Sequence, residues 1–343
     1  MSLDLVFRPR KNDRRWAVVG LLLSVFVLGV PFIFNSYVSG LMFSILMFCI
    51  LASSWNILSG YSGYISFGHA AFFGLGAYAT ALLVIRTGIN PFLAILIAGV
   101  VTVIGSLPLA TATLRLDDVQ FSIVMLAFAE ILLVASQTFE GLTEGVRGLA
   151  LPIGDYALLV YVSMFLLCVV TVLTSYFISR SHIGLALRSI HDDEDAAEAM
   201  GVNTTRYKVL AFSVSAFFPG LTGGIAAIYW TYINPSTVFD PILSGEMMIM
   251  SVLGGMGTVA GPLIGATVLT PLGAETRAQF PFLHGLVFGG LFLLFVLTMP
   301  EGVVNRVINI RSKKQSATTR SLRKSSDPPE TVSQEKIEVK GDE

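Results

Sequence analysis

Charged side chains are scarce in this sequence. Asp, Glu, Lys and Arg make up 13% of the 343 residues and give a formal net charge of −1, whereas soluble domains average about 25% charged residues. Nucleic-acid binding requires a basic patch or stripe, so this charge balance argues against a nucleic-acid partner. Hydrophobic residues reach 54%, which is typical of a protein embedded in a lipid bilayer.

The residues that build metal, redox and nucleotide sites are also few. Cys49 and Cys168 lie inside apolar runs, too few for a disulfide framework, and are expected to be small buried hydrophobic residues. The four histidines show no HExxH spacing, no GxxxxGK[ST] loop occurs, and "ISFGHA" and "ILSGYSG" are not nucleophile elbows. The sequence therefore predicts no metal site, no cofactor, no enzyme activity and no nucleotide hydrolysis of its own.

Apolar runs of about 20 residues, long enough to cross a bilayer, recur along the chain. The first follows a basic start, like a signal peptide, but lacks a small-residue cleavage site and is expected to be retained. The eighth and ninth are short and glycine-rich, so ten spans are expected and eight are the alternative. The predicted fold class is an all-α, polytopic helical membrane protein. The ten spans are Trp16–Phe34, Val38–Leu58, Tyr64–Ile85, Pro91–Leu114, Val119–Phe139, Tyr156–Ile178, Tyr207–Ile233, Pro241–Gly254, Val259–Gly273 and His284–Met299.

The distribution of Lys and Arg predicts the orientation, because these residues accumulate in cytoplasmic loops. With the N-terminus inside, 19 of the 22 lie in inner segments and only Arg86, Arg147 and Arg277 lie outside. Residues 1–15 are then a cytoplasmic segment, 16–303 a membrane domain with a cytoplasmic loop at 180–206, and 304–343 a cytoplasmic tail. The tail is polar enough to be disordered; contact of its basic half with lipid headgroups and simple solvation both stay open.

Two apolar stretches are unusually rich in glycine. In "GYSGYISFGHAAFFGLGAY", Ser66, Ala70 and Gly74 share one helix face that would admit a close neighbour. In "LGGMGTVAGPLIGA", glycines including Gly255 and Gly257 interrupt a predicted span, and broken backbone at membrane depth must be buried in protein or line a wet cavity. Broken segments at matching places in two halves are typical of transporters built from repeats. An internal repeat and glycines used purely for packing are both open.

Ionisable residues within spans are costly and usually functional. Glu130 lies centrally in "MLAFAEILLVAS", where burial would raise its pKa unless a donor pairs with it; an interhelical hydrogen bond and a place in the transport path both stay open. His69 could satisfy a freed carbonyl, Glu246 could be wet near the outer interface, and Trp55 is expected to be an interfacial anchor. The predicted translocation path comprises Asn56, Ser66, His69, Gly74, Glu130, Glu246, Gly255 and Gly257.

An acidic island interrupts the apolar chain at "RSIHDDEDAAEAMGVNTTRYK", residues 188–208. It holds five of the 23 acidic residues within seven positions. Asp192 and Asp193 are good N-cap residues, acid in the first turn favours a helix start, and Gly201 suits a C-terminal stop. The island predicts a helix of two or three turns with a small apolar face of Ala196, Ala199 and Met200. Such a helix is marginal alone and gains stability by docking; the alternative is a solvated connector.

Within this island, "DAAEAMG" resembles the EAA-xxx-G loop that ABC-transporter permeases dock into a cleft of their ATPase subunits. Asp195 stands where Glu is usual, both alanines match, and Gly201 falls at the right spacing. The more distal I-x-L-P is missing, since "YKVLAFSVSA" follows. The resemblance implies an ATPase-coupling loop of Asp192, Asp193, Asp195, Ala196, Ala197, Met200 and Gly201.

Further blocks extend the resemblance over roughly residues 43–303. "NILSGYSGYISFGHAAFFGLGAYATALL", "MLAFAEI", the island with its flanks and "MSVLGGMGTVAGPLIGA" are, in this order, similar to the M-type permease subunits of bacterial high-affinity branched-chain amino acid ABC transporters. One departure is "TEGVRG", residues 143–148, where the family usually has T-G-G-x-x-G and Glu144 replaces a glycine. This departure bears on the docking of a binding protein and on the identity of the substrate.

The resemblance implies a permease of an ATP-driven importer in the bacterial inner membrane, with both termini cytoplasmic. Its implied partners are a second homologous permease, two ABC ATPase subunits that use the ATP, a periplasmic substrate-binding protein and the lipid bilayer. Relatives that import urea, amides or other amino acids are the alternative. A second class, an ion-coupled carrier acting alone with Glu130 as a proton site, leaves the island unexplained, and a passive channel lacks a repeated pore motif.

Overall fold

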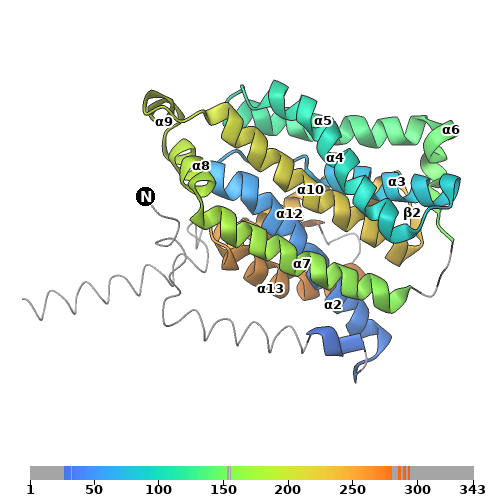
Figure 1. Cartoon of the computed structure of the whole chain (residues 1–343). Helices are drawn as coiled ribbons and strands as arrows, with labels where there is room; N and C mark the ends of the chain where they lie inside the picture. The colour runs from blue at the N-terminus through green and yellow to red at the C-terminus, as the bar shows by residue number, and fades with distance from the viewer. Residues whose placement is uncertain are drawn as a thin grey trace, which may run out of the picture.

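The computed structural model describes residues 27–31, 33–152, 154, 156–279, 285, 286, 289, 290 and 293 of the chain. Figure 1 shows long helices running roughly alongside one another, with short elements gathered at the two ends of the bundle. The long helices are α2 (Ser36–Trp55), α3 (His69–Thr87), α4 (Pro91–Thr113), α5 (Asp118–Thr138), α7 (Ala157–Arg180), α10 (Thr204–Trp230), α12 (Pro241–Gly255) and α13 (Ala260–Gln279).

Short elements mark the two ends of the bundle. Helices α8 (His182–Asp192) and α9 (Glu194–Ala199) lie at one end, which we call the α9 end; α6 (Glu140–Thr143) and β2 (Tyr232–Ile233) lie at the other, the α6 end (Figure 1). The strand β2 pairs antiparallel with β1 (Leu149–Ala150), with Leu149 opposite Ile233. The remaining elements are the 3-10 turn η3 (Gly145–Arg147), the π-helical turn η2 (Asn56–Gly60) and α11 (Pro235–Val238).

The second to ninth predicted spans each correspond to one of the long helices. Within the described residues, seven helical segments have the length and hydropathy to cross a membrane, with η2 continuing α2 and α11 preceding α12. The chain is thus a multi-pass helical membrane protein, with the two-residue strands as a small exception to the all-α prediction. The first and tenth predicted spans, residues 1–15 and the 304–343 tail lie mostly or wholly outside the described residues, so the number of ten is not confirmed.

Helix α10 forms the centre of the bundle, where it packs against α3, α4, α2 and α7. Glycines set its close crossing with α3: a side chain at Gly76 would collide with the Gly220 carbonyl, and one at Gly223 would collide with the Phe73 carbonyl. Without a strong hydrophobic drive between helices in lipid, such small-residue contacts let backbones approach and gain van der Waals packing. The predicted smooth face of Ser66, Ala70 and Gly74 does not make this crossing: Ser66 precedes α3, and the glycine that contacts α10 is Gly76.

The second glycine-rich stretch forms a helical hairpin. Helix α12 ends at Gly255, and α13 begins at Ala260 after a turn in which Gly255 and Gly257 have positive φ, +128° and +75°. L-residues rarely adopt these conformations, whereas glycine reaches them without a Cβ clash. The predicted interruption of the helix is confirmed; the internal repeat is not, and it stays a prediction.

Candidate functional site

His69, the first residue of α3, is fully buried in a network of hydroxyl groups. Its Nδ1 lies 2.8 Å from Ser66 Oγ and its Nε2 lies 2.6 Å from Ser215 Oγ on α10. The Ser215 hydroxyl donates its one proton to the Ser54 carbonyl at 2.7 Å, so Nε2 must be the donor and Nδ1 the acceptor. Both ring nitrogens are occupied, which favours the structural interpretation of His69: it pins the start of α3 to α10.

Trp55 joins the end of α2 to the same network. Its Nε1 donates to the Ser66 carbonyl at 2.8 Å, and the side chain is fully buried. The prediction of an interfacial anchor is therefore wrong; the indole satisfies a backbone carbonyl of the segment 61–68, which is non-helical from Gly63 onward. Ser66 N also donates to Ser59 Oγ at 3.2 Å. The segment obtains from side chains the hydrogen bonds that a helix would provide, as broken backbone in a membrane requires.

Asn56 joins the two glycine-rich stretches. Its Nδ2 donates to the Thr258 carbonyl at 2.9 Å, and its Oδ1 accepts from Gly257 N at 2.8 Å and from Ser251 Oγ at 3.3 Å. Gly255 lies in the same turn, where its carbonyl accepts from Thr258 N at 3.3 Å. A Cβ added at Gly257 would lie 3.1 Å from the Gly60 carbonyl. The structure thus brings together five of the eight predicted path residues in two joined clusters: Ser66 and His69; Asn56, Gly255 and Gly257.

Gly74 and Glu246 lie apart from these clusters. A side chain at Gly74 would collide with the Phe239 ring, which follows α11, so this glycine serves packing toward the α6 end. Glu246 on α12 is 1% exposed and forms an ion pair with Arg277 on α13. The interpretation of Glu246 as a wet residue is wrong, because its side chain is buried, although its partner Arg277 is 51% exposed.

Glu130 faces outward from the chain instead of into the bundle. It lies near the middle of α5, on an exposed face with Ile123, Leu126 and Ile131. Within the described part of the chain, its carboxylate makes no hydrogen bond or ion pair with another residue. The expected burial within the chain is wrong, since α5 packs only lightly against its neighbours and leaves this face uncovered.

The acidic island contains the end of α8, the whole of α9 and the first residues of α10. Asp193 is the N-cap of α9 and accepts from Ala196 N at 2.9 Å, while Asp192 ends α8. At the C-terminus, Gly201 N donates to the Glu198 carbonyl at 2.8 Å and Val202 N to the Ala197 carbonyl at 3.0 Å. This is a Schellman motif, with Gly201 at φ +87°. The predicted caps Asp193 and Gly201 are confirmed, whereas Asp192 is not a cap, and the helix has six residues and is shorter than expected.

Helix α9 buries one alanine against the bundle and exposes its other apolar side chains. Ala197 is 3% exposed and faces inward, whereas Ala196 and Ala199 are exposed and Met200 is 86% exposed. The predicted apolar face is therefore on the outside of the chain. Beside it lies a polar cleft of about 720 Å³, lined by side chains that include Asp117, Asp118, His191 and Glu194. A neighbouring pocket of about 470 Å³ is lined by residues that include Glu194 and Lys208. The sequence analysis did not identify the buried Lys208; its charge near the start of a predicted span was the available signal.

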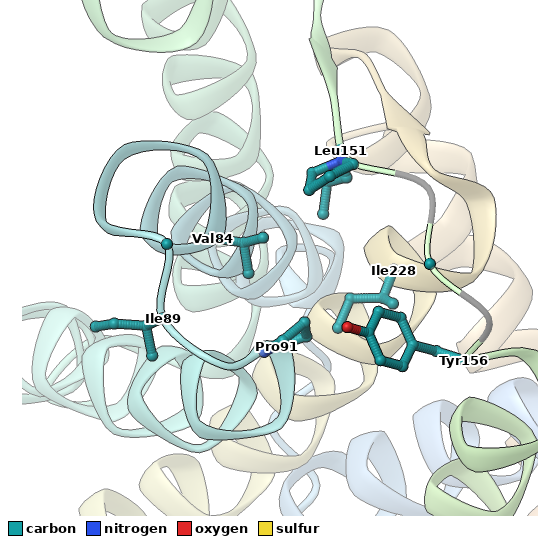
Figure 2. Close-up of a pocket in the computed structure, with 9 residues that line it drawn as sticks. Val84, Ile89, Pro91, Leu151, Tyr156 and Ile228 are labelled. Carbon is teal, nitrogen blue, oxygen red and sulfur yellow. The ribbon is translucent and has the colours of Figure 1, made fainter.

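A cavity at the α6 end has a different character (Figure 2). It measures about 200 Å³ and is lined mainly by apolar side chains from the α3–α4 turn, the residues after β1 and the last turns of α10. The side chains of Val84, Ile89, Pro91, Leu151, Tyr156 and Ile228 surround it. None of the predicted path residues lines this cavity.

Known proteins are similar to this chain over most of its length. The family model for the permease component of branched-chain amino acid transport systems matches residues 37–296. The chain belongs to this family. The family consists of transport permease components, which confirms that the chain is not an enzyme.

Two curated permeases illustrate the likeness. The permease is 27% identical over 290 residues to the high-affinity branched-chain amino acid transport system permease protein LivM of Salmonella typhimurium (strain LT2), covering 76% of this chain and 68% of LivM. It is 25% identical over 286 residues to LivH of Escherichia coli (strain K12), covering 76% of this chain and 91% of LivH. No solved structure matches the permease.

Proposed function

We propose that this chain is the M-type permease subunit of an ATP-driven importer of branched-chain amino acids. It works with a second homologous permease, two ABC ATPase subunits and a periplasmic substrate-binding protein. Family membership and the likeness to LivM, at 27% identity compared with 25% for LivH, support this assignment. The chain needs no cofactor of its own, because the partner ATPases use the ATP.

The observation that carries the ATP-coupled assignment is the exposed apolar surface of α9. A six-residue helix closed by two caps, with Ala196, Ala199 and Met200 turned outward, presents a preformed shape to another protein. A solvated connector would gain nothing from exposing these side chains. The α9 end then faces the cytoplasm, in agreement with the bias of Lys and Arg, and the α6 end faces the periplasm across the bacterial inner membrane, with both termini inside and ten spans in the whole chain.

The exposed face of α5 supports the second permease as a partner. Helix α4 also exposes large apolar side chains, such as Leu96 and Ile104, but carries no charged residue, so its outer face suits lipid. A charge at the bilayer centre costs about 2.5–3.5 kcal/mol on insertion scales, which disfavours lipid around Glu130. We place the α5 face against the paired permease, where Glu130 borders a hydrated path for the substrate; Asn56, Ser66 and His69 shape the segment behind it.

Reconstitution tests the proposal directly. The permease, its paired permease, the ATPases and the binding protein would be placed in proteoliposomes, and uptake of labelled leucine, isoleucine and valine measured with and without ATP. We expect uptake that requires both ATP and the binding protein, and its abolition by Gly201→Pro, whose ring cannot adopt the positive φ of the cap. Uptake driven by a proton gradient without ATP, and lost in Glu130→Gln, would instead indicate an ion-coupled carrier; transport of urea or amides would indicate the related importers.

A further inference from the structure

Glu194, Lys208 and Tyr64 form a closed triangle of contacts between three separate elements. Glu194 is the first residue of α9, Lys208 lies in the second turn of α10, and Tyr64 belongs to the segment 61–68. Lys208 Nζ lies 2.6 Å from Glu194 Oε1 and 3.0 Å from Tyr64 Oη, and the Tyr64 hydroxyl donates to Glu194 Oε2 at 2.6 Å. Each residue therefore contacts the other two.

The triangle is protected from water at its cationic corner. The Lys208 side chain is 3% exposed, and its Nζ also lies 4.5 Å from the centre of the Tyr64 ring. Burial would raise the pKa of the Glu194 carboxyl, but the hydrogen bonds from Lys208 and Tyr64 and the Lys208 charge lower it below its usual value. The carboxylate is thus ionised at neutral pH. The pair is only half-buried, because the Glu194 side chain is 30% exposed; its removal would leave the buried Lys208 charge without its carboxylate partner, at a cost that water near Glu194 reduces.

Helices α9 and α10 are joined to each other by more contacts than join either of them to the segment 61–68. Two bonds tie α9 to α10, the Glu194–Lys208 pair and a 2.6 Å hydrogen bond from Thr204 Oγ1 to Glu198. These hold α9 and the start of α10 as one unit. Among the described residues, the hydrogen bonds between that unit and the segment 61–68 all involve the Tyr64 hydroxyl, and a Cβ added at Gly63 would collide with the ring of His191 on α8.

The segment 61–68 continues directly to the interior of the membrane domain. The Ile65 carbonyl, next to Tyr64, accepts from Ser122 Oγ on α5 at 2.6 Å. Ser66, one residue further, carries the contacts to Trp55 and His69. A displacement of the Tyr64 hydroxyl therefore acts, within two residues, on α5 and on the buried network at the start of α3.

We propose that Tyr64, held by Glu194 and Lys208, is a positioning residue that transmits the movement of α9 to the segment 61–68 during transport. The inference rests on the proposed function, in which α9 docks on the ATPase. Movement of α9 would pull the Tyr64 hydroxyl, and through Ile65 and Ser66 it would shift α5 and the start of α3. The alternative is that the triangle only staples α9 in place, in which case its loss would lower stability and assembly without changing how ATP hydrolysis is converted into uptake.

The test compares Tyr64→Phe with Tyr61→Phe in the reconstituted importer. Both substitutions remove a buried hydroxyl from the same segment, but Tyr61 bonds to Ser175 on α7 and not to the α9 unit. Uptake of leucine and ATP hydrolysis would be measured in the same vesicles. For Tyr64→Phe we expect uptake per ATP to fall about fivefold, the lower end of typical coupling between sites, with copurification of the ATPases unchanged. Tyr61→Phe should keep the wild-type ratio.

If Tyr64→Phe assembles poorly, Glu194→Gln alone tests the same link and should also lower uptake per ATP. Glu194→Gln retains shape but weakens the acceptor, and the double variant Tyr64→Phe/Glu194→Gln should then be no worse than the poorer single variant, since both remove one link. Equal ratios for Tyr64→Phe and Tyr61→Phe, or fully additive losses in the double variant, would overturn the proposal. Absence of ATP-dependent uptake by the wild-type assembly would instead refute the proposed function.

Discussion

Both ends of the bundle contain residues with positive φ, but these residues lie in different surroundings. At the α9 end, Gly201 adopts φ +87° in open space, with no atom within 4 Å of an added Cβ. At the α6 end, Gly148 adopts φ +73° against the β2 strand, and Glu144 adopts φ +56° although it has a side chain. The α6 end is closed on itself by the β1–β2 pair, whereas α9 leaves its surface uncovered. One end is closed by its own backbone pairing, and the other leaves an apolar surface exposed.

The largest effect is expected from Gly148→Ala. With ψ −178°, Gly148 occupies a region that is essentially restricted to glycine and costs other residues about 1–3 kcal/mol. A Cβ there would also collide with the Ile233 carbonyl and separate β1 from β2. We expect the free energy of unfolding to fall by about 3 kcal/mol, measured by denaturant unfolding in detergent.

The matched control at the same end is Gly141→Ala. Gly141 lies in α6, and an added Cβ would meet no atom within 4 Å. We expect little change in stability. A similar loss for both variants would show that the α6 end is not closed by the β1–β2 contact.

Gly88 and Gly201 allow the two ends to be compared, because both have positive φ and open surroundings. Gly88 ends α3 at φ +65° and, like Gly201, has open space around its Cα. Replacing either glycine by Ala should lower the free energy of unfolding by about 1 kcal/mol, because the left-handed conformation costs about 1–2 kcal/mol and the stiffer unfolded chain returns part of it. Only Gly201→Ala should also lower ATP-dependent uptake. Equal uptake by both variants would contradict the assignment of α9 as the docking helix.

Glu144→Gly should act in the opposite direction. Glu144 ends α6 in the left-handed conformation, at a position where the family resemblance expects glycine. Glycine would relieve that strain but make the unfolded chain more flexible, so the net gain should be only about 0.5 kcal/mol. The thermal unfolding midpoint of the variant would rise slightly; a fall would mean that the Glu144 side chain stabilises the α6 end by contacts that offset its backbone strain.

Acid should produce the smallest change, and it should act at the α9 end. The folded-state pKa of Glu194 lies below its usual value of 4.5, so its stabilising contribution is present above that pH and is lost as the pH falls through the folded-state pKa. The β1–β2 hydrogen bonds join backbone groups that do not titrate. We expect the difference in stability between the wild type and Glu194→Gln to be constant from neutral pH to about 5 and to shrink below 4.5. A difference that persists at pH 3 would contradict the ion pair.

The features predicted correctly from the sequence are those set by neighbouring residues. Apolar runs in the sequence predict all eight long helices. Asp193 and Gly201 define the ends of α9 through hydrogen bonds that span only a few positions. The errors concern residues whose surroundings come from distant parts of the chain. Trp55 was assigned to the bilayer interface because its partner, the Ser66 carbonyl, exists only where the segment 61–68 folds back. Glu130 was expected to be buried because a linear run of apolar residues does not indicate which helix lies at the edge.

The π-helical turn at Asn56–Gly60 has a consequence for how relatives of this permease differ in length. A π turn holds one residue more within each hydrogen-bonded ring than an α turn, so deleting one residue from it can restore an α-helix while Asn56 and Tyr61 keep their partners. A one-residue deletion within α3 or α10 would instead rotate everything beyond it by about 100° and remove Gly76 from its contact with Gly220. When homologous permeases are aligned, we expect single-residue gaps to be tolerated at this turn and absent from the crossing of α3 and α10.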